Sequence, residues 1–389
     1  MASPSPIAHT SSSAGPRVAL VNLRSGGRRA AEDVLRRLSD TLGADRVWVL
    51  FESVNAESHR AELEVFLREQ APQHVIVAGG DGTISFVMDV IKRLQDQRLL
   101  SPSRGVIAPF PLGTGNDLSI TLGFGSGFAR WVVLGGRRFR RLMRTYDTAS
   151  TTKVDRWLLS VATTSAQHPG GLAHEYVLNN YFSVGFDAAV ASRLNGFRGR
   201  HPHLFTTRPV VKLWYAVFAV MALFTEEKIG SAVSLDIDGR RVRVPASAKS
   251  VAVCNMLTYA GGAVAWNAAA ADHYARPSVC DGCVEVVCFY GIWHLALVRL
   301  GWSYGVKLGQ GSSVHLETGP LSCQFDGEEV LNVTDTGGRS TFHVSRFSHS
   351  ECLTVPPRQE TNAFLVLFVL AAVALLLVLW LSPSLVIEK

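Results

Sequence analysis

The stretch VIVAGGDGTISFVMDV, residues 75–90, joins a β-branched apolar run to a helical pattern through a turn that contains three glycines. Val75, Ile76 and Val77 favour a short buried strand. From Ile84 onward apolar residues recur at helical spacing, so the stretch predicts a strand, a glycine-rich turn and a helix. Such a turn directs free backbone N–H groups to the start of the helix, where an anion can bind. A tight turn without a ligand would give the same pattern, because a single glycine motif has little specificity.

The same alternation extends from Arg17 to about Tyr146. Further strands are expected at residues 18–21, 47–51 and 105–110, and further helices at residues 29–42 and 57–70. Strands that alternate with helices across short loops favour a parallel sheet covered by helices. The sequence therefore predicts a Rossmann-like α/β domain over residues 16–150.

Three glycine-rich loops follow strands of this domain, at residues 21–27, 79–83 and 111–118. Ligands of parallel sheets bind beyond the carboxyl ends of the strands, so the three loops are expected to form one pocket for phosphates. None of them matches the P-loop pattern, the dinucleotide-binding fingerprint or the protein-kinase motifs. The candidate binding residues are Asn22, Arg24, Ser25, Gly26, Gly79, Gly80, Asp81, Gly82, Thr83, Gly113, Thr114, Gly115, Asn116 and Asp117.

After about Asp147 the pattern changes to short apolar or alternating runs separated by Gly and Asp turns. These runs lie at residues 176–191, 231–244, 250–257, 283–290, 313–319 and 323–330. They predict a second, β-rich sandwich domain over residues 151–345. The sequence does not indicate where a further segment, residues 339–354, packs in the fold. We expect residues 1–15 to be a disordered tail and residues 346–362 to be a linker.

Ala363–Leu381 contains nineteen residues without a charge. As a helix this stretch would be about 28 Å long at about 1.5 Å per residue, which is close to the hydrocarbon thickness of a bilayer. A buried core helix is the alternative, but the stretch is apolar on every side. It predicts a transmembrane anchor that holds the rest of the protein in the cytosol. The twelve-residue run Leu213–Phe224 is too short to span a bilayer and is expected to be a core helix.

The composition narrows the classes of partner. A chain of 389 residues favours two domains, and its net charge of +6 suits an anionic substrate or an acidic membrane surface. No zinc-finger spacing or aromatic-basic stripe indicates nucleic-acid binding. Cys280 and Cys283 form one C-x-x-C pair without a second pair, so ordinary thiols are expected rather than a zinc site. The basic residues Arg137, Arg141 and Arg144 share a helical face that either is solvated or lies on anionic lipid.

The three loops, in this order, resemble those of the diacylglycerol kinase family, within the superfamily of lipid kinases. The sequence GGDGT (79–83) is shared across that superfamily, whereas PLGTGNDLSITLGFG (111–125) is more specific. Segments of the second domain resemble the accessory domain of the eukaryotic members, and together the resemblance covers roughly residues 17–345. Those segments lie at residues 155–157, 179–191, 208–215, 259–266, 281–287 and 324–330. The chain departs from the family pattern at Leu23, where proline is usual, and at Cys280, where relatives often have aspartate.

The resemblance implies an ATP- and Mg²⁺-dependent kinase that phosphorylates the free hydroxyl of diacylglycerol and produces phosphatidate. In bacterial relatives the acid that matches Asp281 takes the proton of the lipid hydroxyl, although an Asp-Gly turn before a strand would explain Asp281 equally well. Asp81 would contact Mg²⁺ bound to ATP or accept that proton, or it would cap the helix near Ile84. The alternatives are a kinase for sphingosine, ceramide or monoacylglycerol and a catalytically silent, membrane-tethered lipid-binding protein. The oligomeric state is not indicated.

Overall fold

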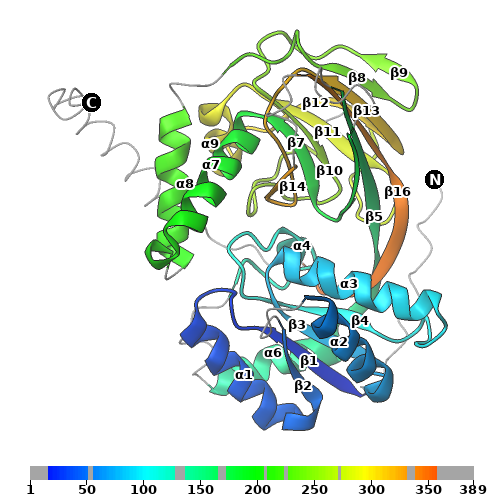
Figure 1. Ribbon diagram of the computed structural model, residues 1–389. Helices are drawn as coiled ribbons and strands as arrows, with labels where there is room; N and C mark the ends of the chain where they lie inside the picture. Colours follow the sequence, from blue (N-terminus) through cyan, green and yellow to red (C-terminus); the bar gives the residue numbers. More distant parts are fainter. Residues whose placement is uncertain are drawn as a thin grey trace, which may run out of the picture. The chain divides into compact units, whose positions relative to one another are not determined.

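The computed structural model describes residues 16–50, 56–127, 136–164, 172–205, 208–222, 227–269, 273–330 and 338–356. The chain divides into two compact units (Figure 1). Unit 1 is Met1–Val154 with Ser350–Pro357, and unit 2 is Asp155–His349 with Arg358–Lys389.

Unit 1 contains a parallel sheet in the strand order β2-β1-β3-β4, with the end of β16 beside β4. Helices alternate with these strands, as the sequence predicts. The strands are β1 (Arg17–Asn22), β2 (Val47–Leu50), β3 (His74–Gly79) and β4 (Val106–Pro111). The helices are α1 (Arg28–Leu42), η1 (Ala44–Arg46), α2 (Ala56–Gln70), α3 (Asp81–Asp96), α4 (Asp117–Thr121) and α6 (Gly136–Thr148). Residue 51, the expected end of the second strand, lies outside the described residues.

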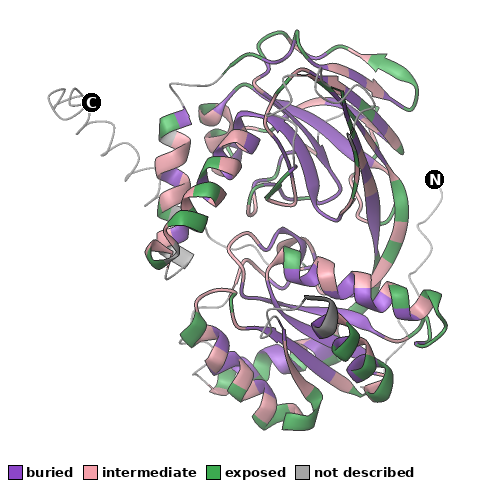
Figure 2. Cartoon of the chain, in the orientation of Figure 1, coloured by how far each residue is buried: buried purple, intermediate pink, exposed green. Residues whose placement is uncertain are grey.

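The apolar pattern of the sequence explains this unit. Every residue of β3 and β4 is buried, as expected for central strands of a parallel sheet (Figure 2). In α3 the buried side chains recur at helical spacing from Ile84 to Leu94, so one face of the helix packs on the sheet. Basic side chains of α6, including Arg137, Arg141 and Arg144, are exposed on the opposite side from its buried Phe139 and Leu142.

Unit 2 is a sandwich of two largely antiparallel sheets. One has the order β12-β11-β10-β7-β14-β15, and the other contains β16-β13-β8-β9 with β5 and β6. Side chains of both sheets form one core, in which the rings of Phe182 and Phe342 lie 4.9 Å apart. The strands are β5 (Ser150–Thr164), β6 (Leu172–Leu178), β7 (Tyr181–Gly185), β8 (Ser234–Ile237), β9 (Arg240–Val242), β10 (Ser250–Cys254), β11 (Val284–Phe289), β12 (Val306–Gly311), β13 (Ser313–Thr318), β14 (Cys323–Phe325), β15 (Glu328–Glu329) and β16 (Arg339–Thr354).

Three features of unit 2 differ from the expectation. The run at residues 176–191 is not all strand, because β7 ends at Gly185 and α7 (Phe186–Arg200) begins there. Gly185 has φ of 121°, a value that ends the strand and favours glycine. The expected core helix exists as α8 (Arg208–Ala222), but Leu213 and Met221 are each 54% exposed, so its assignment to the core is wrong for these side chains. Strand β16 continues to Thr354, through the first part of the expected linker.

The remaining helices of unit 2 are η2 (Pro202–Leu204) and α9 (Ile292–Arg299). Within the ranges that the structure describes, no helix is long and apolar enough to cross a membrane. The expected anchor at Ala363–Leu381 and the expected tail at residues 1–15 both lie outside the described residues.

Strand β11 buries a carboxyl group. Glu285 is 2% exposed, and its Oε1 accepts a hydrogen bond of 2.9 Å from Nε2 of Gln310 on β12. Burial is the main cause that raises the pKa of Glu285 to about 8, with a smaller contribution from Asp281. A raised pKa means that the folded protein holds this proton more tightly than the unfolded chain does.

This carboxyl group predicts a pH dependence of stability. The stabilising effect of the bound proton is complete below the unfolded pKa of about 4.5 and is lost as pH rises through about 8. Glu285→Gln keeps an oxygen for Gln310 and cannot ionise. We therefore expect this variant to gain free energy of unfolding relative to the wild type as pH rises from 5 to 9, by up to about 1.4 kcal/mol per pH unit.

Urea unfolding followed by circular dichroism at several pH values measures this difference. Glu175→Gln, at an exposed position on β6, is the control and should show no growing gain. A constant difference between Glu285→Gln and the wild type across this pH range would contradict the prediction.

Candidate active site

The three glycine-rich loops follow β1, β3 and β4 and are joined by direct contacts. Nδ2 of Asn22 in the first loop donates a hydrogen bond of 2.8 Å to Oγ1 of Thr83 in the second. The backbone oxygen of Gly79 accepts hydrogen bonds from the N–H groups of Leu112, at 2.9 Å, and Gly113, at 3.2 Å. The structure therefore brings the three predicted segments together at one edge of the sheet of unit 1.

Close packing between these loops requires several of the glycines. A Cβ atom on Gly79 would lie 2.5 Å from Cβ of Thr83, and one on Gly80 would lie 3.1 Å from Cα of Gly113. A Cβ on Gly113 would clash in turn with Cα of Gly80. Gly26 has φ of +71°, and a Cβ there would clash with the carbonyl oxygen of Leu112. At these four positions the loops themselves explain why side chains are absent.

Gly82 is different. It lies in the first turn of α3, and a Cβ atom on it would meet no atom of the described residues within 4 Å apart from the neighbouring backbone. A helix position also gives no conformational reason for glycine, which is less favourable there than alanine by about 1 kcal/mol. Packing among the described residues therefore does not require this glycine, whereas a ligand that approaches the start of α3 would require it.

Asp81 connects the second and third loops. Its Oδ2 accepts a hydrogen bond of 3.0 Å from the N–H of Asp117, and its Oδ1 accepts one of 3.2 Å from Leu118. These donors are the first N–H groups of α4. The alternative role that the sequence suggests, a cap on the helix near Ile84, is therefore wrong: α3 begins at Asp81 itself, with Gly80 at its N-cap, and Asp81 caps α4 instead.

Oxygen atoms gather around the third loop. A Cβ on Gly115 would lie 3.5 Å from Oδ2 of Asp81 and 3.7 Å from Oδ2 of the buried Asp117, so the two carboxylates flank this glycine. Asn116 adopts the left-handed conformation with φ of 59°, and its Nδ2 donates to the carbonyl oxygens of Gly113 and Ser126. Its Oδ1 is buried and has no hydrogen-bond partner among the described residues. A buried acceptor without a donor favours a ligand that supplies positive charge or a proton.

The first loop contains a four-residue turn. The N–H of Ser25 donates to the carbonyl oxygen of Asn22 at 3.1 Å, and the N–H of Arg24 donates to Oδ1 of Asn22 at 2.9 Å. The side chain of Arg24 is exposed, and Thr114 in the third loop is partly exposed. A guanidinium at this edge can form a charge-assisted contact with an anion.

Asp281 belongs to unit 2, whereas Asp81 and the glycine-rich loops belong to unit 1. Its exposed side chain lies in the turn before β11, where Oδ1 accepts a hydrogen bond of 3.0 Å from the N–H of Cys283. Partial burial is the largest cause that raises the pKa of Asp281, and the charge of Asp155 adds to it, while Arg346 acts in the opposite direction.

Two residues that the sequence did not single out hold this turn. Asp155 is 1% exposed, and its Oδ2 accepts a hydrogen bond of 2.8 Å from the N–H of Gly282. Its Oδ1 forms an ion pair of 2.7 Å with Nη2 of Arg346. Gly282 has φ of +72°, which favours glycine after Asp281. Asp155 stands in a segment with a family resemblance, but its partners are far away in the sequence, so no local pattern indicates the contact.

Asp326 and Asp238, which stand in similar Asp-Gly turns, are more than turn residues. The carboxylate of Asp326 accepts hydrogen bonds of 2.8 to 3.0 Å from the N–H groups of Asn179, Asn180 and Tyr181. Asp238 accepts hydrogen bonds from the N–H groups of Ser312 and Ser313 in the same way. Both carboxylates fix a neighbouring backbone segment of unit 2, and neither role requires a ligand.

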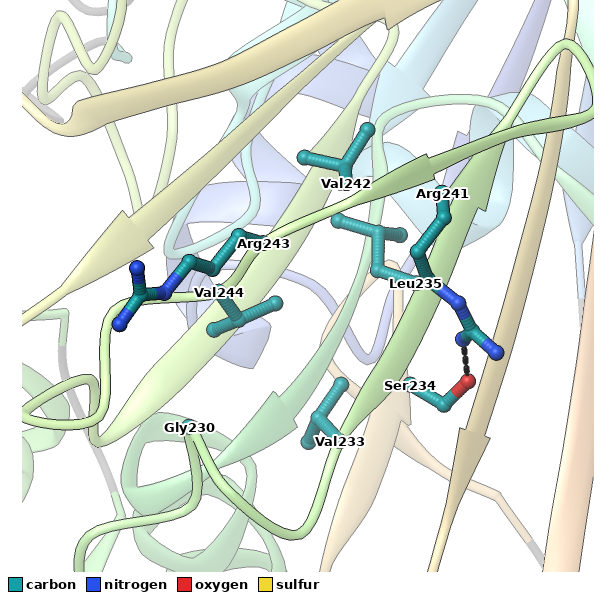
Figure 3. Close-up of a pocket in the computed structure, with 8 residues that line it drawn as sticks. All are labelled: Gly230, Val233, Ser234, Leu235, Arg241, Val242, Arg243 and Val244. Carbon is teal, nitrogen blue, oxygen red and sulfur yellow. Dashed lines mark hydrogen bonds between the residues drawn. The ribbon is translucent and has the colours of Figure 1, made fainter.

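A separate hollow of about 420 Å³ lies beside the β8–β9 hairpin of unit 2 (Figure 3). Apolar side chains form much of its wall, and Arg241 and Arg243 extend in different directions from it. The Arg241 guanidinium donates a hydrogen bond to Oγ of Ser234 and pairs with Asp236 at 3.4 Å. None of the candidate residues from the sequence lines this hollow.

Comparison with known proteins agrees with the division into two units. Residues 16–139 match the family model of the diacylglycerol kinase catalytic domain, and residues 177–329 match that of the diacylglycerol kinase accessory domain. A solved structure of a presumed diacylglycerol kinase from Bacillus anthracis str. Sterne superimposes with a TM-score of 0.51. At 17% identity, with 89% of this chain and 99% of that chain covered, it supports the fold.

Two proteins of Arabidopsis thaliana are more similar in sequence. Diacylglycerol kinase 1 is 32% identical over 328 residues, which cover 83% of this chain and 43% of that protein. Diacylglycerol kinase 2 is 31% identical over 324 residues, which cover 82% and 44%. The chain thus spans less than half the length of these curated relatives. Since the catalytic and accessory models together match well over half of its residues, in the expected order, the chain belongs to the diacylglycerol kinase family.

Proposed function

We propose that this protein is an ATP-dependent lipid kinase that phosphorylates the free hydroxyl of diacylglycerol and produces phosphatidate. The observation that carries the proposal is Gly82, a glycine in the family loop GGDGT whose missing side chain the fold does not require. The names of the two Arabidopsis thaliana relatives support diacylglycerol as the substrate.

The residues of unit 1 suit the phosphate chain of ATP. Phosphoryl transfer requires a protein mainly to position the reactants and to neutralise the charge that moves between them. The N-terminus of α3 presents backbone N–H groups beside Gly82, and Arg24 adds an exposed cation in the first loop. The hydroxyl of Thr83 accepts a hydrogen bond from Asn22, and its own proton can be donated to a phosphate oxygen.

The residues around Gly115 fit Mg²⁺. This cation prefers oxygen ligands and is commonly held by one or two carboxylates together with substrate phosphates. Asp81 and Asp117 would supply carboxylate oxygens, and Oδ1 of Asn116, which accepts no hydrogen bond from the described residues, would supply an amide oxygen. When bound, the cation would neutralise negative charge on the phosphates. Asp81 would keep its contacts with α4 at the same time, since a carboxylate can accept more than two interactions.

Asp281 is the residue that we propose as the base. It would accept the proton of the lipid hydroxyl as that oxygen attacks the γ-phosphorus of ATP, while the bond from this phosphorus to the bridging oxygen breaks and ADP leaves. Its side chain is exposed, and its raised pKa makes it a stronger base than an ordinary aspartate. Asp155 and Arg346 would act as positioning residues, because they hold the turn through Gly282 and do not themselves carry the proton.

Adding a side chain at Gly82 tests the nucleotide site. Gly82→Leu should abolish ATP binding and turnover without loss of stability, because a Cβ at this position meets no atom of the described residues and leucine favours a helix more than glycine does. Gly196→Leu in α7 is the matched control, since a Cβ on Gly196 likewise meets no atom of the described part of the chain within 4 Å. Thermal unfolding and calorimetric titration with ATP measure both effects. Normal ATP binding by a folded Gly82→Leu protein would contradict this site.

Replacing the proposed base tests the second site. Asp281→Asn keeps an oxygen for the N–H of Cys283, so the turn should persist. Turnover should fall by about 10²–10⁴-fold while ATP binding is unchanged. Asp238→Asn, in the similar Asp-Gly turn of unit 2, should keep full activity. Activity of Asp281→Asn close to that of the wild type would assign Asp281 to the turn alone.

We further propose that Ala363–Leu381 anchors the protein in a membrane, with the catalytic part facing the cytosol. The length and lack of charge of this stretch support the proposal. Deletion of residues 363–381 should move the protein from the membrane fraction to the soluble fraction, with turnover on detergent-dispersed diacylglycerol retained. A deletion variant that stays bound to membranes as firmly as the full chain would count against the anchor.

An assay with labelled ATP and separate lipids tests the function as a whole. Incorporation of label into diacylglycerol, and much less into sphingosine, ceramide or monoacylglycerol, is the expected result. Label in one of the other lipids would change the substrate and keep the reaction type. Lack of label in every lipid, with ATP bound or not, would favour the silent lipid-binding alternative.

A further inference from the structure

Large apolar side chains gather on the surface of unit 2 around α9. Tyr290, Trp293, Leu297, Trp302 and Tyr304 are 42%, 56%, 41%, 76% and 42% exposed, respectively, and we call these five residues the α9 patch. Single exposed apolar residues are common on proteins, whereas a cluster marks an interaction surface. None of the five belongs to the proposed nucleotide site or to the turn of Asp281.

Contacts along the chain show that the five residues share one surface. Trp293 and Leu297 are four residues apart on α9 and therefore lie on one face of the helix. The N–H of Trp302 donates a hydrogen bond of 2.9 Å to the carbonyl oxygen of Leu297, which folds the turn after α9 back onto the helix. Helix α8, which packs against α9, adds the exposed Leu213 and Met221 to the same part of unit 2 (Figure 1).

His294 holds the two tyrosines of the patch. Its Nδ1 accepts a hydrogen bond of 3.1 Å from the N–H of Tyr290, and its Nε2 lies 2.9 Å from the carbonyl oxygen of Tyr304. Because Nδ1 is the acceptor, Nε2 carries the proton and donates to that carbonyl. The rings of Tyr290 and His294 are also stacked, with centroids 5.3 Å apart. The patch is therefore preorganised, which lowers the entropy cost of binding a partner.

The chemistry of the patch suits the surface of a lipid bilayer. Trp and Tyr have an apolar body and a polar group at one end, and they are enriched at membrane–water interfaces. Residues 286–316 contain no Asp or Glu, and helix α8 contains Arg208 and Lys212 but no acid. A segment without acidic residues beside a helix that contains basic residues complements anionic lipid headgroups.

We propose that the α9 patch docks unit 2 onto an anionic bilayer, with the side chains of Trp293 and Trp302 inserted among the headgroups. The proposal rests on the proposed function, because a kinase for diacylglycerol must reach a substrate that lies in a bilayer. It is separate from the anchor, since Ala363–Leu381 would tether the chain without placing any surface of unit 2 on the lipid.

A fluorescent probe beside the patch tests the docking in the full chain. Cys280 and Cys283, the cysteines whose side chains are not buried, are replaced by serine, and Ser303→Cys is labelled with the polarity-sensitive dye NBD. The protein is reconstituted in vesicles of phosphatidylcholine and phosphatidylserine. We expect emission at higher intensity and shorter wavelength than for the dye in water, and quenching by lipids that carry a nitroxide near the headgroup.

Two controls make the result specific. His315→Cys, at an exposed position of β13, should give a dye in water that these lipids do not quench. Adding Trp293→Ser and Trp302→Ser to the Ser303→Cys protein should abolish both the emission change and the quenching. Thermal unfolding of this variant should match the wild type, because both side chains are exposed.

The outcomes separate docking from the other proposals. A dye at position 303 that remains in water, in a protein that phosphorylates detergent-dispersed diacylglycerol, would overturn the docking and leave the kinase intact. A quenched dye, together with a wild-type protein that has no kinase activity, would keep the docking and refute the function. If the dye is shielded from water only when a vesicle holds more than one protein molecule, the patch binds a second copy of the chain. A dye that is shielded from water but not quenched by the nitroxide lipids would show that other residues of the chain cover the patch.

Discussion

The contacts between backbone atoms of the three glycine-rich loops are the constraint on which unit 1 depends. Parallel pairing of β1, β3 and β4 places the three loops at one edge of the sheet, but pairing alone does not fix their spacing. The hydrogen bonds from Leu112 and Gly113 to Gly79, and the approach of Gly80 to Gly113, fix it. Loops that pack this closely leave no room for side chains, so most of the glycines serve the fold before any ligand is present.

This distinction changes the meaning of the glycine motif. In the sequence the glycines of residues 79–83 look equivalent, and all of them suggest a phosphate site. In the structure Gly79 and Gly80 face other parts of the protein, while Gly82 faces open space at the start of a helix. Only a position where the protein itself would accept a side chain indicates that a ligand excludes one. Gly82 therefore carries more weight for function than the four glycines that the packing explains.

Local patterns in the sequence predicted unit 1 well because its contacts are of the kind that local patterns encode. Apolar runs and helical spacing located the strands and helices of this unit to within a few residues. The same reasoning extended a strand past Gly185, where a helix begins, and placed α8 in the core, although Leu213 and Met221 are exposed. It also missed Asp155 and Arg346, which support the turn of Asp281. These contacts join residues far apart in the sequence, so only the folded chain shows them.

The two departures from the family pattern have different consequences in the structure. Leu23 is the second residue of the turn that the hydrogen bond from Ser25 to Asn22 closes, and proline is favoured at this position of a turn because its φ is already fixed. Leucine is compatible with the turn but lacks the fixed φ of proline. The hydrogen bond from the N–H of Arg24 to Oδ1 of Asn22 restrains the loop instead. Cys280 stands directly before the proposed base. A second carboxylate there would raise the pKa of Asp281 further, so in this chain Asp155 is the neighbouring acid that contributes to the raised pKa. The chain thus retains both turns while it lacks the usual residue in each.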